Sequence, residues 1–274
     1  MAAAAAALVA SIPKIPCRES LIMVHREALE AYLHEQLAVG ECTDYAPNGL
    51  QVAGRERIET LVTGVTASAA LLEAAAAAGA DAVLVHHGYF WKGEDPRLVG
   101  MKGRRVRLLM EAGINLYAYH LPLDVHPELG NNAGLARLFG WEVTERRSAH
   151  GVPGLLWVGR PAAPLDPGAL RRGLAEALGR EPTHVAAAPE RIERLAWCSG
   201  GAERLLEQAA GLGVDAYVSG EISEPTAHAA RELGVHYFAA GHHATERSGV
   251  QALGAHLGEA FGINHRYIEI SNPA

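Results

Sequence analysis

Short β-branched runs alternate with longer alanine- and leucine-rich stretches through most of the chain. In the first half, this pattern predicts strands at residues 58–63, 81–85 and 114–119. Helical periodicity, ended in each case by a glycine, predicts helices at residues 67–78, 104–111 and 131–139. Because strand–helix–strand alternation is typical of parallel pairing, the pattern predicts an α/β fold.

The second half repeats this order and several of the residues. The segments IETLVTG, AGADAVLVHHG and AGINLYAYH resemble IERLAWC, LGVDAYVSGE and LGVHYFAAGH. The corresponding predicted strands are residues 192–197, 215–219 and 235–239, and the predicted helices are 203–211 and 226–233. Such a repeat predicts two related α/β lobes with quasi-twofold symmetry and a metal site in the cleft between them. Chance is the alternative explanation for the short strand matches.

We therefore expect residues 23–140 to form the first lobe and residues 141–274 the second. A predicted strand, helix and strand between residues 151 and 189 would enlarge the second sheet. Residues 1–22 contain an alanine run without the basic residues of a signal peptide, so we expect a disordered extension. The alternative is an N-terminal helix that packs on a partner.

Composition narrows the class of protein. The chain has 274 residues, 49% of them apolar, and a formal net charge of -7, which makes nucleic acid an unlikely partner. No apolar run reaches the roughly 18 residues that a membrane span needs. Cys17, Cys42 and Cys198 lie far apart without a CxxC pair, which excludes a disulfide framework and a zinc ribbon and favours a cytoplasmic location.

Histidines follow three of the predicted strands at their carboxyl ends. They are His86 and His87 after DAVLV, His120 after NLYAY, and His242 with His243 after HYFAAG. Two of these ends add a carboxylate four residues later, Asp124 and Glu246, about one helical turn away. Since carboxyl ends of strands border the ligand crevice of an open α/β sheet, we expect these side chains to converge. A lone histidine after a strand is more often structural, but three converging ends argue against that reading.

Imidazoles and carboxylates together suit divalent Zn, Fe, Mn or Ni. Six candidate ligands exceed the four of a single zinc, so we predict two divalent ions about 3.5–4 Å apart, bridged by Glu246 or Asp124. The predicted ligands are His86, His87, His120, Asp124, His242 and Glu246.

Neighbouring residues carry weaker signals. Glu221, which aligns with His87 in the repeat, is a candidate general base or partner of a ligand, or else a helix-terminal carboxylate. His243 is a candidate proton shuttle. The aromatic run from Tyr89 to Trp91 could form a wall against a planar substrate, or belong to the core or an interface. The basic residues Lys102, Arg104, Arg105 and Arg107 could hold phosphates, although a solvated helix face is the simpler interpretation.

The segments HHGYFWKGE, YHLPLDVHPELGNNAGLA, GEISEPTAHAAREL and AAGHHATERSGVQALG resemble a known family. It is the GTP cyclohydrolase I type 2 family, the dinuclear-metal hexamer proteins related to the NGG-one-interacting factor, in its short bacterial form. The similarity runs from about Met23 to the closing ISNPA. It implies the six ligands named above and a homohexamer with metal sites that face an interior cavity.

Hydrolysis is the natural reaction of two Lewis-acidic ions that share a water. The resemblance implies that GTP and water yield formate and 7,8-dihydroneopterin triphosphate, although no P-loop supports nucleotide binding. Two alternatives stay open: a two-metal hydrolase of another small molecule, and a non-catalytic metal-binding or regulatory ring.

Overall fold

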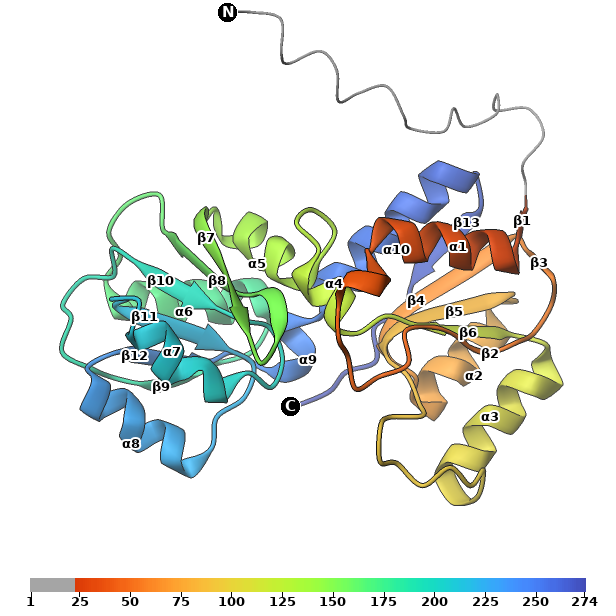
Figure 1. Cartoon of the computed structure of the whole chain (residues 1–274), viewed down its shortest axis with the longest axis horizontal. Coiled ribbons are helices and arrows are strands. Elements are labelled where there is room, and N and C mark those ends of the chain that lie inside the picture. Colours follow the sequence, from red (N-terminus) through yellow and green to blue (C-terminus); the bar gives the residue numbers. More distant parts are fainter. Residues whose placement is uncertain (1–22) are drawn as a thin grey trace, which may run out of the picture.

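The chain folds into two α/β lobes that lie side by side in the computed structural model (Figure 1), which describes residues 23–274. The disorder expected for residues 1–22 lies outside the described residues. Each lobe is built on one sheet with a parallel centre, so the predicted α/β class is confirmed. None of the helices in residues 23–274 combines the length and hydropathy that a bilayer crossing requires.

The first sheet has the strand order β13-β4-β5-β6-β2, in which only β2 is antiparallel to its neighbour. Its strands are β2 (Gly49–Val52), β4 (Thr60–Thr66), β5 (Ala82–His87), β6 (Asn115–Ala118) and β13 (Asn264–Tyr267). A separate antiparallel ribbon joins β1 (Val24–His25) to β3 (Arg57–Ile58). The helices of this lobe are α1 (Arg26–Gln36), the 3-10 turn η1 (Val39–Glu41), α2 (Ala69–Ala77), α3 (Gly100–Ala112) and α10 (Arg247–Phe261).

Helices cover both faces of this sheet. Leu33 of α1 and Leu253 of α10 pack on one face, while Leu72 of α2 and Leu109 of α3 pack on the other, all of them fully buried. Burying one such leucine stabilises the fold by about 1.5–3 kcal/mol. The strands between these layers are apolar on both sides. Because β4, β5, β6 and β13 run parallel, their carboxyl ends lie at one edge of the sheet.

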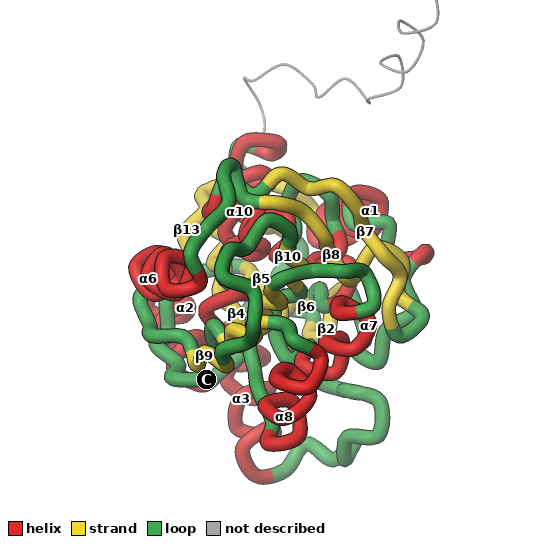
Figure 2. The backbone as a smooth tube through the Cα atoms, turned by 90° about the vertical axis from the view of Figure 1, so that its left-hand side faces the viewer, coloured by secondary structure: helices red, strands yellow, loops and turns green. Residues whose placement is uncertain are grey.

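The second sheet has the order β7-β8-β10-β11-β12-β9, with β10, β11 and β12 parallel. Its strands are β7 (Glu142–Ala149), β8 (Val152–Arg160), β9 (Thr183–Val185), β10 (Leu195–Trp197), β11 (Ala216–Ser219) and β12 (His236–Ala239). The helices around it are α5 (Asn131–Phe139), α6 (Pro167–Leu178), η2 (Glu203–Leu205), α7 (Leu206–Ala210) and α8 (Glu224–Leu233). An end-on view of this lobe places α6 and α7 on opposite sides of its strands (Figure 2).

Matching contacts recur in the two lobes. Asp81, just before β5, accepts hydrogen bonds through Oδ2 from two successive backbone N–H groups at the start of β4, at 3.0 and 3.1 Å. Asp215, just before β11, accepts from two successive N–H groups ahead of β10, at 2.8 and 2.9 Å. The aspartate shared by AGADAV and LGVDAY therefore makes the same pair of hydrogen bonds to the neighbouring strand in both sheets. This correspondence supports the predicted repeat.

The division expected at residue 140 differs from the observed one. After the short helix α9 (His242–Thr245), the chain returns to the first lobe, where α10 packs on β4 and β13 pairs in parallel with β4. In the other direction, Ala133 and Leu135 of α5 pack with the core of the second sheet. Periodicity predicts that a helix has an apolar face, but not which of two sheets that face covers. The chain consequently passes between the lobes twice, before α5 and after α9.

Candidate metal centre

The buried strand β5 ends on His86 and His87, and the side chain of His86 is fully buried. Its ring Nδ1 lies 2.9 Å from the backbone oxygen of Tyr119, so Nδ1–H donates there, and in the neutral ring Nε2 carries the free lone pair. That Nε2 lies 3.4 Å from Asp124 Oδ2 and 3.4 Å from Glu246 Oε1. Strand geometry therefore turns one ring nitrogen toward the backbone and the other toward two carboxylates.

His87, the last residue of β5, has the same division between its two ring nitrogens. Nδ1 lies 3.3 Å from the Thr66 hydroxyl, and Nε2 lies 3.3 Å from Glu246 Oε2. Because successive residues of a strand point to opposite faces, His86 and His87 approach Glu246 from different sides.

His120 follows β6 and is positioned by a loop residue far away in the sequence. Its Nδ1 lies 2.9 Å from Asp44 Oδ1, and the Leu121 backbone N–H donates to Asp44 Oδ2 at 2.9 Å. The His120 backbone N–H donates to Asn48 Oδ1 at 2.7 Å. These contacts begin α4 (Leu121–Val125), whose single turn brings Asp124 back to the same side as His120.

Asp124 is buried, and its two carboxylate oxygens have different surroundings. Oδ1 accepts from Asn131 Nδ2 and from the Ser199 hydroxyl, both at 2.9 Å. Oδ2 remains on the side of His86. Asp124 thus has one carboxylate oxygen, Oδ2, free to coordinate a metal ion.

Helix α9 begins at His242, and Glu246 follows its last residue, so the two side chains lie four residues apart. His242 Nδ1 lies 2.6 Å from Glu221 Oε1, and His242 Nε2 lies 3.1 Å from Glu246 Oε1. The loop after β10 closes over them at Gly200, which has a φ of 67°, and a Cβ there would collide with Glu246 Oε1. Glycine is required at this position because the backbone runs directly against the carboxylate.

The site as a whole fits divalent metal ions. Each of the four imidazoles is held through Nδ1 by an oxygen behind it, the arrangement that orients metal-binding histidines in proteins. His86 Nε2 and Glu246 Oε2 are buried without a hydrogen-bond partner, a costly state that a cation would relieve. Three groups have their ligand atoms within 4.8 Å of one another: His86, His87 and His120; His87, His242 and Glu246; and His86, Asp124 and Glu246.

Protonation compensates the buried carboxylates when no cation is bound. Burial disfavours the charge on His86, but the carboxylates of Asp124 and Glu246 outweigh burial and raise the pKa of His86 well above its usual value. Burial opposes and Glu246 favours the charge on His242, and the pKa of His242 rises to about 9. Burial dominates at His87, where the pKa falls to about 3. A divalent ion that binds here displaces protons.

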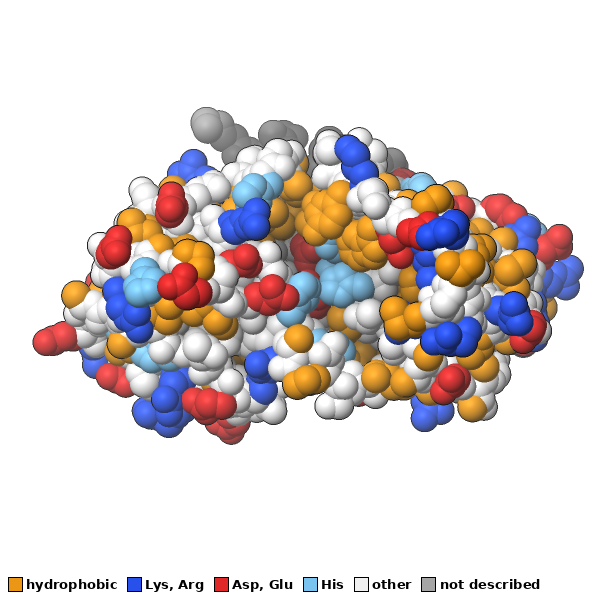
Figure 3. All heavy atoms as spheres, turned by 90° about the horizontal axis from the view of Figure 1, so that it is seen from below, with side chains coloured by type: hydrophobic (Ala, Val, Ile, Leu, Met, Phe, Trp, Pro, Cys, Tyr) orange, Lys and Arg blue, Asp and Glu red, His pale blue; other side chains and the backbone are white. Residues whose placement is uncertain are grey.

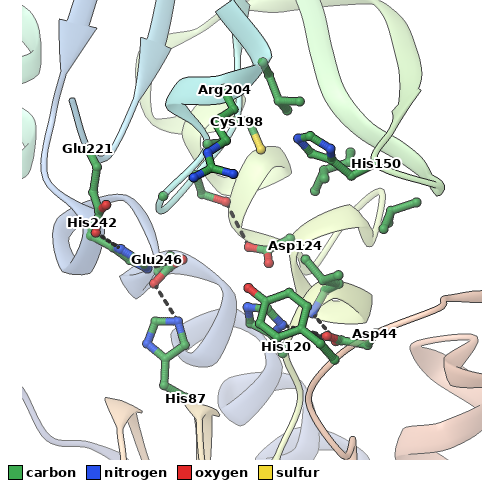
Figure 4. Close-up of a pocket in the computed structure, with 18 of the residues that line it drawn as sticks. Asp44, His87, His120, Asp124, His150, Cys198, Arg204, Glu221, His242 and Glu246 are labelled. Carbon is green, nitrogen blue, oxygen red and sulfur yellow. Dashed lines mark hydrogen bonds and ion pairs between the residues drawn. The ribbon is translucent and has the colours of Figure 1, made fainter. Parts of the chain in front are cut away.

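A cavity of about 780 Å³ opens between the lobes beside these residues. Seen from below, the surface is hollowed at this place and histidine side chains gather in the hollow (Figure 3). Five of the six predicted ligands line the cavity, and His86 lies buried behind them. Figure 4 shows His87 and His120 on one side, Glu221, His242 and Glu246 on another, and Asp124 between them.

Residues 24–273 match the Duf34/NIF3 (NGG1p interacting factor 3) family. The chain belongs to this family. A relative from Allochromatium vinosum, named GTP cyclohydrolase 1 type 2 homolog, is 55% identical over 253 residues, which cover 92% of this chain and 99% of that protein. A relative of the same name from Escherichia coli K12 is 49% identical over 247 residues, which cover 90% of this chain and 98% of the relative.

Solved structures share the fold over the same span. The protein ybgI, titled as being of unknown function, superposes with a TM-score of 0.88 at 48% identity and covers 92% of this chain and 100% of its own. TTHA1606 from Thermus thermophilus superposes with a TM-score of 0.82 at 32% identity, over 92% of this chain and 100% of its own. The family resemblance predicted from the sequence motifs is confirmed.

Within this Duf34/NIF3 chain, the fold brings together all six predicted ligands and Glu221, but not His243. His243 does not line the cavity; its Nε2 lies 2.7 Å from Glu269 Oε1, and its backbone N–H donates to the Ala274 oxygen at 3.3 Å. One residue along α9 turns the side chain away from His242, toward the C-terminal segment. The geometry therefore gives His243 a structural contact, and Glu221 a place beside the ligands.

Of the aromatic and basic residues that the sequence singled out less strongly, some line the cavity and others do not. Trp91 lines the cavity, whereas Tyr89 is buried in the first lobe and donates to the Ala67 oxygen at 2.6 Å. The basic residues of α3 do not line the cavity, and Lys102 pairs with Glu94 at 3.3 Å. They therefore cannot contact the phosphates of a substrate bound in this cavity beside the metal ligands.

The residues of this Duf34/NIF3 site that sequence reasoning missed include Asp44, Tyr45, Lys92, His150 and Arg204. Asp44 and Tyr45 lie in a loop with no strand or helix pattern to place them. Lys92 directly follows the aromatic run, so its place after a predicted strand was an available signal. Arg204 lies in the predicted helix 203–211, whose pattern does not point to the cavity.

Proposed function

We propose that this protein is a metal-dependent hydrolase that holds two divalent ions, of Zn, Fe, Mn or Ni, in the cleft between its lobes. One observation carries the proposal: four imidazoles and two carboxylates converge, and every imidazole is held from behind through Nδ1. Six donors exceed the four of one zinc ion. The proposed ligands are His86, His87, His120, Asp124, His242 and Glu246.

Glu246 is the better candidate for the bridging carboxylate. Its Oε1 lies 3.1 Å from His242 Nε2, and its Oε2 lies 3.3 Å from His87 Nε2, so its two oxygens face different sets of ligands. Asp124 has one oxygen occupied by Asn131 and Ser199. Of the two bridges that the sequence left open, the contacts favour Glu246.

Two such ions, when bound, act as Lewis acids that lower the pKa of a water and stabilise negative charge that develops during hydrolysis. The chain supplies the remaining functions. Tyr45 and Trp91 lie against His120, with ring centroids 5.1 and 5.0 Å from it, and provide aromatic surface for a planar ring. The half-exposed carboxylate of Glu221 lines the cavity, where it can accept and return a proton.

GTP is the substrate that we propose first, because the curated relatives carry the name GTP cyclohydrolase 1 type 2 homolog. The expected products are formate and 7,8-dihydroneopterin triphosphate. The test is formate release from GTP by protein reconstituted separately with zinc, manganese and iron, and with Glu246→Gln as the inactive control. A protein that holds two ions and releases no formate would reject GTP, and a panel of phosphoesters and cyclic amides would then be the next test.

We also propose a cytoplasmic homohexamer, which rests on the family resemblance. Light scattering on the purified protein should give six times the 29.0 kDa mass of one chain. A monomer at micromolar concentration would contradict it.

A further inference from the structure

The outer wall of the cleft carries cationic side chains that the metal centre does not use. These are Arg204 in η2 and Lys92, which follows the aromatic run, and both line the cavity. The nearest carboxylate to the Arg204 guanidinium is Glu203, at 4.0 Å, and the Arg204 side chain is 86% exposed. Across residues 23–274, no carboxylate lies within 4.0 Å of the Lys92 ammonium. These charges are therefore available to a ligand.

Arg204 lies apart from the metal ligands, on another part of the cavity wall. Figure 4 shows Arg204 and His150 on the side of the pocket opposite His87 and His120, with Asp124 between the two groups. Tyr45 and Trp91 flank His120, and the Lys92 backbone N–H donates to the Tyr45 oxygen at 2.8 Å, which fixes Lys92 beside this aromatic wall. The cavity thus combines an aromatic wall next to the ligands, where Lys92 also lies, with the positive charge of Arg204 on the opposite side.

We propose that this outer wall is a subsite for the phosphate groups of a phosphorylated heterocyclic substrate, with Arg204 as its principal contact. The proposal rests on the hydrolase function above and deepens it: the substrate is a nucleotide rather than a nucleoside or a free base. Arginine presents a planar fork of donors that matches phosphate oxygens, and it holds its charge at any physiological pH. A cavity of about 780 Å³ has room for a substrate of this size.

The chain's overall charge makes the local arrangement informative. With a net charge of -7, the protein surface does not attract phosphates in general. The larger basic cluster of α3 lies outside the cavity, and one of its members, Lys102, pairs with Glu94. Positive charge that faces the cavity is thus confined to a few side chains, and single substitutions can test it.

The test separates this subsite from the metal ions, which also attract phosphates. Calorimetry on the metal-loaded protein measures the affinity for inorganic tripolyphosphate in the wild type, in Arg204→Gln and in the control Arg160→Gln. Arg160 ends β8, outside the cavity, and its side chain is 61% exposed. We expect Arg204→Gln to weaken tripolyphosphate binding about tenfold or more, because a charge-assisted pair is lost. Arg160→Gln should bind like the wild type, and Arg204→Lys should recover part of the loss.

Two results would overturn the subsite: tripolyphosphate affinity that is the same in Arg204→Gln and in the wild type, or no tripolyphosphate binding at all. Where formate release is observed, an equal kcat/KM for GTP and guanosine would overturn it as well. A tenfold loss in Arg204→Gln supports the subsite even when GTP releases no formate. Tripolyphosphate binding through Arg204 without formate release would reject the proposed reaction on GTP, but a phosphorylated substrate would still be supported.

Discussion

Two histidine–carboxylate pairs, one from each lobe, support the metal centre in different ways. His120 contacts Asp44 at 2.9 Å in the first lobe, and His242 contacts Glu221 at 2.6 Å in the second. The Asp44 side chain is 3% exposed, whereas that of Glu221 is 49% exposed. Both carboxylates line the cavity, but the Asp44 side chain is buried in its contact and the Glu221 side chain is half exposed.

The surroundings of the two carboxylates explain what this difference means. Asp44 also accepts from Asn48 and from the backbone N–H groups of Ala46 and Leu121. Burial opposes its charge, but His120 and these donors outweigh burial and lower the pKa of Asp44 to about 2. Among the hydrogen bonds of residues 23–274, the Glu221 carboxylate accepts only from His242. Asp44 is a fixed structural support, and Glu221 retains oxygen atoms that a substrate or water can reach.

The largest effect is expected at Glu246, which both halves of the site share. Glu246→Gln removes the charge that faces His86, His87 and His242, so we expect at most one ion per chain and at least about a hundredfold loss of formate release. Metal analysis and a formate assay on the same sample measure both. Glu259→Gln on the exposed face of α10 is the matched control. A Glu246→Gln protein that retains two ions would contradict the account of both lobes.

The second-largest effect is expected at Asp44, the buried carboxylate of the first pair. In Asp44→Asn, a single amide oxygen must replace a carboxylate that accepts from three residues and a histidine. We expect metal affinity to fall about tenfold to a hundredfold and the free energy of unfolding to fall by about 1–3 kcal/mol. Metal titration and chemical denaturation of the metal-free protein check the two parts. Unchanged stability would mean that Asp44 does not hold the loop in place.

Glu221→Gln should lower turnover more than metal affinity, in contrast to Asp44→Asn. Because the Glu221 side chain is half exposed, water can replace its contact with His242, and we expect metal affinity to change only a few-fold. Turnover should fall about a hundredfold if Glu221 handles a proton. The decisive comparison is kcat at saturating metal in Glu221→Gln and Asp44→Asn. A Glu221→Gln enzyme with full metal and full kcat would reduce Glu221 to an orienting residue.

The smallest effect at the site is expected one residue away, at His243. His243→Asn removes a contact with Glu269 outside the cavity, so we expect metal content and kcat to stay at wild-type values. The free energy of unfolding should fall by about 1 kcal/mol. Thermal denaturation and the formate assay test this together. Loss of kcat at full metal content would restore His243 as a catalytic candidate.

The sequence predicted the ligands because their signal is local. An apolar run that ends in histidine places that histidine at the end of a strand, and a carboxylate four residues later faces the same way. Asp44 carries no such signal: it lies 76 residues from His120, in a loop without periodicity. Contacts of this kind depend on how the lobes close, which no spacing along the chain encodes.

Local sequence pattern also could not predict where the chain passes from one lobe to the other. In the structure α10 packs on β4, and β13 pairs with β4 at the edge of the first sheet. In the same way, the basic residues of α3 stood out in the sequence, but it is Arg204, isolated in the second lobe, that lines the cavity. Clusters are visible in a sequence, while the direction in which they face is decided by packing.

The most direct test of the account is the number of ions that one chain holds. Purified protein is loaded with excess zinc or manganese, freed of unbound metal by gel filtration and measured by plasma mass spectrometry against protein concentration. Six converging donors predict two ions per chain. One ion per chain would contradict the dinuclear site, and none would mean that the convergence of these histidines and carboxylates serves another purpose.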